Sequence, residues 1–474
     1  MQQPLPSGEI PPEASSDLEP VAKGSNELSV PTSNEVELDP SQDGLYSWIC
    51  VACVFLLNMH TFGINGCYGI FLSYYLSSNT FPGATYIDYA LVNGLSISQA
   101  LFVSPLVTYT TRLYGTRTTL LIGSFLEASA LIGASFSTSI WHLFLSQGVC
   151  SGWGMGFLFL GTIGIVPQWF TKRRSLAAGL ASAGAGTGGL VYNLAANAII
   201  RNISLRWAYR ILAIIAFTIN STCAFFIKDR NQRIGAVQKV FDYKLFSDAE
   251  FLALSAWSVF SIIGYVILSF SLPAYALSIG LTTQQGAIIG SMLNLAQAVG
   301  RPCVGYFSDR VGRINMTAIA SLACGLACLC IWIPARGFAV VVLFAIFSGL
   351  FVGNNWAATA PVSAEMFGIQ LLPSILSTLW LLQTLPGTFA ELIALGLRRK
   401  GGQNTYRPTQ IFTGILYVGA ALLMWFIRAR RVQQSQPNMD CSQTSSSPQD
   451  QSLARRNRSS DIRLFRAALQ WKKV

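Results

Sequence analysis

Apolar residues gather along the chain into long runs that short polar or charged segments separate. Twelve such runs cover residues 48–76, 86–110, 118–138, 141–167, 175–200, 207–227, 251–278, 285–307, 315–334, 338–361, 371–397 and 409–428. Each run approaches or exceeds the roughly 20 residues that an α-helix needs to cross a bilayer. Because backbone amides in hydrocarbon must be hydrogen-bonded within their own segment, the pattern predicts twelve transmembrane helices.

The composition also indicates a membrane-embedded chain. Of the 474 residues, 52% are hydrophobic and 11% are charged, whereas soluble domains carry about 25% charged residues. The net charge of +11 lies in the loops and the C-terminal tail, where it bears on orientation and on contact with lipid headgroups. We therefore expect an all-α membrane protein whose partners include the lipid bilayer and exclude nucleic acid.

Polar segments divide the chain into five parts. Residues 1–45 are rich in acids and predict a disordered tail, and residues 431–474 form a basic tail. A central loop at 229–250 separates a half with six runs, 46–228, from a second half with six runs, 251–430. The loops on the side of the tails carry more Lys and Arg than those opposite, so we expect both termini in the cytosol. We expect the plasma membrane as the host membrane.

A charged stretch between the eighth and ninth runs follows the pattern Gly-x-x-x-Asp-Arg-x-Gly-Arg. It consists of Gly305, Asp309, Arg310, Gly312 and Arg313. A worn copy lies at 108–117, where alignment on Gly115 puts Thr108 at the first glycine position and Arg112 at the aspartate position. This doubled motif resembles the loop signature of the major facilitator superfamily of transporters. The resemblance implies two six-helix halves that open alternately, with Asp309, Arg310 and Arg313 as a gate.

Two further motifs narrow the resemblance. Residues 169–184, Trp-Phe-Thr-Lys-Arg-Arg-Ser-Leu-Ala-Ala-Gly-Leu-Ala-Ser-Ala-Gly, and residues 43–48, Asp-Gly-Leu-Tyr-Ser-Trp, are similar to signatures of the monocarboxylate-porter family. Together with residues 361–365 and 372–374, they resemble the fungal branch of that family. Animal members that carry lactate-like acids have a lysine where this chain has Gly66 and an acid where it has Gln297, while their arginine is present as Arg301. These two departures argue against a small monocarboxylate substrate.

Polar side chains at helical spacing within apolar runs predict a substrate cavity. Such residues recur on the first, seventh, eighth and eleventh runs, and the candidates for substrate binding are Asn58, Asn65, Tyr265, Asn294, Gln297 and Arg301. The alternative is that these groups only join neighbouring helices. Four such stripes, one with an arginine and one with a glutamate, favour a cavity.

A charged side chain within the membrane indicates a functional site more strongly than a neutral polar one. Placing such a charge at the centre of the membrane costs about 3 kcal/mol even on the lenient insertion scale. Arg301 is the candidate for binding an anionic substrate group, and a pair with a neighbouring helix is the alternative. Glu391 is the candidate for carrying a coupling proton, with a place at the membrane interface as the alternative. Asn202 begins an Asn-Ile-Ser sequence in a loop expected outside, which makes it a glycosylation candidate.

These features predict a secondary transporter that moves a small organic metabolite, anionic or polar, by alternating access, with proton coupling as an option. Export of a fungal secondary metabolite and a non-transporting membrane sensor are the alternatives. The chain has two His residues, and most of its ten Cys residues lie scattered in apolar runs. We therefore expect no enzyme activity, no cofactor and no metal site.

Overall fold

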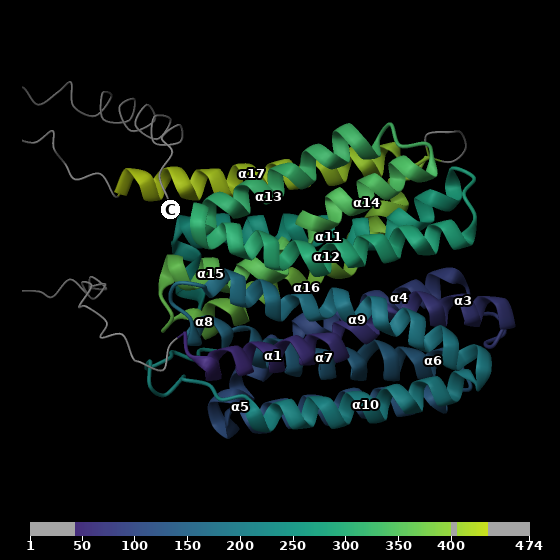
Figure 1. The fold of residues 1–474 in the computed structure, drawn as a ribbon, viewed down its shortest axis with the longest axis horizontal. Helices are drawn as coiled ribbons and strands as arrows, with labels where there is room; N and C mark the ends of the chain where they lie inside the picture. Colours follow the sequence, from purple (N-terminus) through teal and green to yellow (C-terminus); the bar gives the residue numbers. More distant parts are fainter. Residues whose placement is uncertain (1–42, 400–404, 435–474) are drawn as a thin grey trace, which may run out of the picture. The chain divides into compact units, whose positions relative to one another are not determined.

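Long helices that lie side by side make up the fold (Figure 1). The computed structural model describes residues 43–399 and 405–434. Within these ranges the chain forms helices and their connections, and no strand. The two tails predicted from the sequence fall almost entirely outside the described residues.

The first half contains six membrane-crossing rods, several of which are built from consecutive helices. In chain order they are α1 (Leu45–His60) with α2 (Phe62–Gly66) and α3 (Tyr68–Ser78); α4 (Tyr86–Phe102) with the first part of α5 (Ser104–Ser135); the rest of α5; α6 (Ile140–Leu143) with η1 (Phe144–Cys150), α7 (Ser151–Ile163) and α8 (Val166–Trp169); α9 (Arg174–Asn202); and α10 (Leu205–Phe226). The backbone of Gly115 divides α5 into two rods, because its φ of 79° is not helical.

Six more rods follow a connection that contains the short helix η2 (Tyr243–Ser247). They are α11 (Ala249–Ser278); α12 (Thr283–Val311); α13 (Arg313–Ala327) with η3 (Cys328–Trp332); α14 (Phe338–Val352) with α15 (Asn354–Phe367); α16 (Leu372–Gly396); and α17 (Arg407–Gln434). Since the number of rods is even, the first and last described residues lie at one end of the bundle. We call this end the terminal side and the other end the far side.

Nine segments of the described chain are long and apolar enough to span a membrane on those criteria alone. The rods they leave out contain α4, α9 and α12, which are shorter or richer in glycine and polar residues. These helices lie where the two halves meet. A methyl group added to Gly179 of α9 would lie 2.4 Å from the carbonyl oxygen of Arg301 in α12, so α9 needs small residues to approach α12.

The two copies of the charged motif adopt similar turns. Gly115 has φ 79° and Gly312 has φ 109°, and each stands between two rods on the terminal side. Positive φ is easy for glycine and costly for other residues. Both copies therefore need a glycine at the turn, although only the second copy retains the aspartate.

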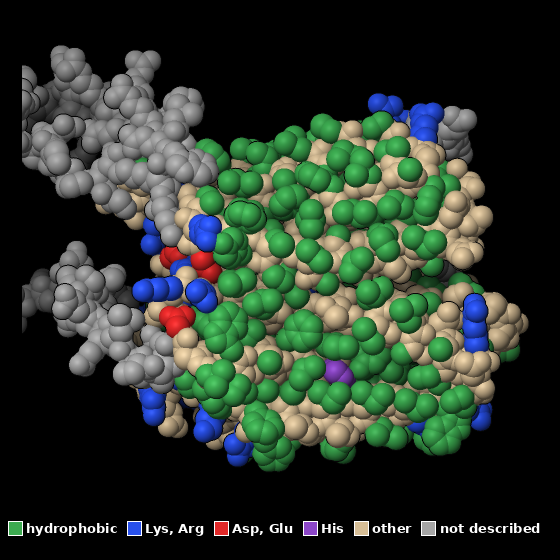
Figure 2. All heavy atoms as spheres, in the orientation of Figure 1, with side chains coloured by type: hydrophobic (Ala, Val, Ile, Leu, Met, Phe, Trp, Pro, Cys, Tyr) green, Lys and Arg blue, Asp and Glu red, His purple; other side chains and the backbone are tan. Residues whose placement is uncertain are grey.

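The surface shows how the bundle meets the membrane. In the view of Figure 2, hydrophobic side chains cover the flank, while Lys and Arg side chains gather toward the two ends. Large apolar side chains that face outward include Phe125, Leu194 and Leu385. This distribution suits a protein whose flank contacts lipid and whose ends contact water and headgroups.

Candidate functional site

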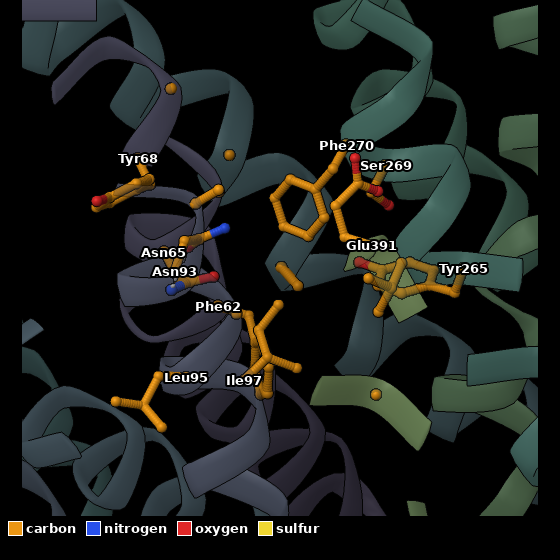
Figure 3. Close-up of a pocket in the computed structure, with 18 of the residues that line it drawn as sticks. Phe62, Asn65, Tyr68, Asn93, Leu95, Ile97, Tyr265, Ser269, Phe270 and Glu391 are labelled. Atoms are coloured by element: carbon orange, nitrogen blue, oxygen red, sulfur yellow. Dashed lines mark hydrogen bonds between the residues drawn. The ribbon is translucent and has the colours of Figure 1, made fainter. Parts of the chain in front are cut away.

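A cavity of about 340 Å³ lies between the two halves. Its wall includes every substrate-binding candidate and the proton-coupling candidate from the sequence, namely Asn58, Asn65, Tyr265, Asn294, Gln297, Arg301 and Glu391. Figure 3 shows Asn65 and Asn93 on one wall, and Phe270 and Glu391 on the wall opposite. Helical spacing alone thus selected residues that the fold brings to one place.

The side chain of Arg301 is 5% exposed and lies in the cavity wall. One terminal nitrogen donates to the carbonyl oxygen of Ser182 at 2.6 Å, and the other donates to Oε1 of Gln297 at 2.9 Å. A methyl group on Gly353 would lie 2.5 Å from Nε of Arg301, so the bend between α14 and α15 packs directly against the guanidinium. Among the described residues, no carboxylate forms an ion pair with this buried cation.

The asparagines of the first half join helices as well as line the cavity. Nδ2 of Asn58 donates to the carbonyl oxygen of Ala181 at 3.0 Å and so ties α1 to α9. Nδ2 of Asn65 donates to Ser96 Oγ at 2.8 Å and to Asn93 Oδ1 at 3.3 Å, which ties α2 to α4. Both roles weighed from the sequence, helix joining and cavity lining, therefore apply to these side chains.

Glu391 lies on α16, toward the far side. Both of its carboxylate oxygens accept from Ser271 Oγ at 3.1 Å, and Oε1 lies 3.7 Å from a guanidinium nitrogen of Arg398. It is the one carboxylate among the described residues of the cavity wall. Glu391 thus has a long ion pair and a hydroxyl partner, and its side chain still lines the cavity.

Contacts between the two halves close the terminal side. The carboxylate of Asp309 accepts the backbone N–H groups of Ser175 at 3.0 Å and Leu176 at 2.9 Å, in the first turn of α9. A carboxylate at this position is favoured by the partial positive charge of a helix N-terminus. Arg313 extends the contact, because it donates to Ser175 Oγ at 3.1 Å and pairs with Glu365.

Arg310 lies outside this contact, although the sequence analysis included it in the gate. Its side chain is exposed, and its guanidinium carbon lies 4.3 Å from the centre of the Tyr306 ring on the same helix. Arg310 is four residues after Tyr306, so stacking along one helix face explains the geometry. The facing helix is thus held by Asp309 and Arg313.

The first, incomplete copy of the charged motif lies at a second contact between the halves on the terminal side, between α5 and α16. A Cβ on Gly305 would lie 2.4 Å from the Ser175 carbonyl oxygen, and Thr108 occupies the matching position in the copy. A hollow of about 50 Å³ remains beside Thr108, lined also by Gln238 and Ser377. The larger residue and the missing acid thus leave this contact more open than the contact at Asp309.

The central loop binds α16 beside this hollow. Ser374 Oγ donates to the Val237 carbonyl oxygen at 2.7 Å and accepts the Lys239 N–H at 2.9 Å. Ser377 Oγ donates to the Val240 carbonyl oxygen at 2.7 Å. We call residues 237–240 the loop strap. The sequence did not indicate the loop strap, because a polar loop carries no signal for the helix that it will contact.

Aromatic rings form the floor of the cavity on its terminal side. Phe62, Phe159, Tyr265 and Trp356 line the cavity, and Trp380 stacks behind Trp356 with ring centres 5.4 Å apart. Of these aromatic residues, only Tyr265 was a substrate-binding candidate from the sequence. Phenylalanine and tryptophan on an apolar run are compatible with lipid, core or cavity, and hydrophobic periodicity does not separate these locations.

The residues that line the cavity begin near the middle of the bundle, a little toward the terminal side for Phe159 of α7, and continue to the far side. They extend from Arg301, in the middle of the bundle, to Ile87 in the first turn of α4 and Leu395 in the last turn of α16. The contacts of Asp309, Arg313 and the loop strap lie on the terminal side. The described state is therefore closed on the terminal side, and its cavity extends toward the far side.

The glycosylation candidate Asn202 is exposed and is the last residue of α9. Ser204, the third residue of its acceptor sequence, caps α10 by accepting the Trp207 N–H at 3.3 Å. The connection between the helices is Ile203 and Ser204. Modification of Asn202 stays a prediction, and this short connection leaves little room for it.

Known proteins place this architecture in a family. The model of the Major Facilitator Superfamily matches residues 50–391 and, in a second match, residues 254–468. The probable transporter MCH2 of Saccharomyces cerevisiae is 31% identical over 411 residues, which cover 85% of this chain and 86% of the relative. The transporter ESBP6 of the same yeast is 32% identical over 415 residues, covering 84% of this chain and 61% of the relative.

Solved structures agree on the fold. The proton:xylose symporter XylE, bound to 6-bromo-6-deoxy-D-glucose, superposes with a TM-score of 0.63 at 15% identity and covers 80% of this chain and 95% of its own. The relatives confirm a secondary transporter of a small organic metabolite and do not favour the export alternative. The chain therefore belongs to the major facilitator superfamily of transporters, in the fungal branch that its sequence motifs indicated.

Proposed function

We propose that this transporter carries an organic anion, whose charged group binds Arg301. The observation that carries the proposal is the buried guanidinium, which has two neutral oxygen partners and no carboxylate partner within the described chain. An arginine stays charged in proteins, and a buried charge without a counter-ion is costly. An anionic substrate supplies that counter-ion, and the planar guanidinium suits a carboxylate.

The contacts of Arg301 also suggest how binding couples to movement. Its bond to the Ser182 carbonyl joins α12 of the second half to α9 of the first half. A substrate carboxylate is a stronger partner for a guanidinium than a neutral carbonyl oxygen. A bound anion that takes over this donor loosens one contact between the halves, so substrate binding favours their movement by alternating access.

The gate belongs to the same cycle. Opening the terminal side requires Asp309 to leave the first turn of α9 and Arg313 to leave Ser175. We place the terminal side in the cytosol, because of the excess of Lys and Arg in the loops of that side. The plasma membrane is the proposed host membrane. On this assignment the cavity of the described state extends toward the outside.

Glu391 is the proposed carrier of a coupling proton. It shares the cavity with Arg301, and a carboxylic acid that exchanges its proton with the cavity can link proton movement to substrate movement. A proton taken up with a monovalent anion leaves the transported charge balanced. The same residue contacts Arg398, so its protonation weakens an attachment near the far side of α16.

Transport by Arg301 variants tests the proposal. Arg301→Gln keeps hydrogen-bonding groups but loses the charge, and we expect uptake per molecule at the membrane surface to fall at least about tenfold, because a charged hydrogen bond contributes roughly 1.5–3 kcal/mol. Arg301→Lys keeps the charge but loses the planar donor pair, so its uptake should fall less. Arg310→Gln, outside the cavity, is the matched control. Normal uptake by Arg301→Gln would refute the proposed anion site.

A further inference from the structure

The cavity has two chemically different faces. Amide groups and the Arg301 guanidinium form one face, with Asn58, Asn65, Asn294 and Gln297 among its residues. The other is the aromatic floor, to which each half contributes rings. Phe62 of the first half lies with its ring centre 5.3 Å from that of Trp356 of the second half. A ligand in this space therefore meets polar donors on one side and flat apolar rings on the other.

The indole of Trp356 gives the floor an unused donor. The side chain is 6% exposed and lines the cavity, and its Nε1 is itself buried and has no hydrogen-bond acceptor within the described part of the chain. Three rings hold the indole in place, with centre distances of 5.3 Å to Phe62, 5.4 Å to Phe159 and 5.7 Å to Tyr265. A buried indole N–H usually has a partner, so an acceptor on the transported molecule is the natural candidate.

The volume of the cavity suits acids larger than lactate. A volume of about 340 Å³ falls in the range of about 300–1,000 Å³ that holds drug-sized ligands. A three-carbon acid such as lactate can satisfy Arg301 but leaves the floor without contact. An acid with a planar ring can meet both faces at once, because rings stack on or pack edge-to-face against aromatic side chains.

We infer that the transported anion is an aromatic carboxylate, whose acid group binds Arg301 while its ring lies on the floor formed by Phe62, Phe159, Tyr265 and Trp356. This inference rests on the proposed anion transport and narrows its substrate class. An acceptor on the ring receives the hydrogen bond of Trp356 Nε1. Trp356 then determines specificity, because it contacts the part of the substrate that distinguishes aromatic from aliphatic acids.

Binding to the purified full chain in lipid nanodiscs, measured by calorimetry, tests this inference with three probes. Phenylacetate supplies the acid and the ring, lactate the acid alone, and 2-phenylethanol the ring alone. We expect phenylacetate to bind at least about tenfold more tightly than either of the others, since an aromatic contact adds roughly 0.5–1.5 kcal/mol beyond its buried area. Arg301→Gln should weaken both acids.

Substitutions of Trp356 isolate the ring contact. Trp356→Leu should reduce phenylacetate binding to the level of lactate and leave lactate binding unchanged, which also shows that the variant is folded. Trp356→Phe keeps a ring and loses the N–H. 4-Methoxyphenylacetate should therefore bind about threefold to tenfold more tightly than phenylacetate in the parent protein, and equally tightly in Trp356→Phe.

The outcomes separate this inference from the function on which it rests. Equal binding of lactate and phenylacetate, with both lost in Arg301→Gln, would overturn the aromatic class and leave anion transport standing. Equal binding of 2-phenylethanol and phenylacetate, unaffected by Arg301→Gln, would overturn anion transport. A preference for phenylacetate over lactate that is the same in Trp356→Leu and in the parent protein would show that the floor only blocks the pathway, which contradicts the inference. Failure of all probes to bind contradicts both.

Discussion

Arg301 shows what one sequence can predict about a single residue. Its spacing of four and seven residues from Gln297 and Asn294 correctly placed these side chains on one helix face and in one cavity. Its partner, the carbonyl oxygen of Ser182, lies 119 positions away in the sequence. Periodicity defines the face of a helix but not the neighbour of that face, because helices of similar composition can pack in many orders.

The proposed role of Glu391 leads to a prediction about proton coupling. Glu391→Gln keeps the size and hydrogen-bonding capacity of the side chain but does not exchange a proton. We expect uptake by this variant to become independent of an imposed pH gradient, while exchange of substrate across the membrane continues. Proteoliposomes with defined inner and outer pH provide the measurement.

Asp88→Asn is the control for Glu391→Gln. Asp88 is also an acid on the far side, but it caps the start of α4 through Thr85 and does not line the cavity. Its substitution should leave the response to the gradient intact. Gradient-driven uptake that persists in Glu391→Gln would assign the coupling proton to another group.

At the scale of helices, the polar stripes in the sequence indicated helices that line a cavity, but not the contacts that hold these helices together. The glycines of α9 and the polar stripe of α12 mark these two helices, and they meet closely enough that Gly179 and Gly305 have no room for a methyl group. The loop strap on α16 had no counterpart in the sequence analysis. A loop's contacts depend on where the fold places its two ends, which a single sequence does not specify.

The contact between Asp309 and α9 should set the balance between the two open states. Asp309→Asn removes the charge that faces the helix N-terminus, an interaction worth about 0.3–2 kcal/mol. We expect the population open on the terminal side to rise by about twofold to thirtyfold. A cysteine at Thr111, which lines the hollow on that side, should react faster with a thiol reagent added there.

Arg310→Gln serves as the control for Asp309→Asn, because it changes the neighbouring charge without touching α9. Its labelling rate should match that of the parent protein. Equal labelling rates in Asp309→Asn and the parent would show that Asp309 does not hold the gate closed.

The loop strap gives a second prediction at this scale. Ser374→Ala removes the hydroxyl that bonds the Val237 carbonyl and the Lys239 N–H. Because each bond contributes roughly 0.5–1.5 kcal/mol, amide exchange of residues 237–240 should accelerate at least about twofold. Hydrogen–deuterium exchange followed by mass spectrometry measures it.

Ser348→Ala provides the comparison for Ser374→Ala, since Ser348 Oγ is buried and bonds a carbonyl of its own helix, Phe344. That variant should leave exchange in the strap unchanged. Equal protection of residues 237–240 in Ser374→Ala and the parent would mean that the hydroxyl does not fasten the strap.

For the whole molecule, the apolar runs predicted the number and order of the rods, and the doubled motif predicted matching turns at Gly115 and Gly312. The boundaries were less accurate where helices continue through a break, as at Gly115 inside α5. Helix length and apolarity also do not identify α4, α9 and α12 as membrane-spanning helices, because residues that line a cavity need not be compatible with lipid.

The terminal side is closed while the cavity extends to the far side, and we propose that the two sides open in turn. Spin labels on cysteines that replace Arg112 and Arg310 report the spacing of the two halves on the terminal side. In a second variant, labels on cysteines that replace Pro82 and Gly396 report the spacing on the far side. Pulsed electron–electron double resonance should show that Asp309→Asn lengthens the 112–310 distance and shortens the 82–396 distance. If both distances lengthen together, or neither changes, the account of the gate and of alternating access is contradicted.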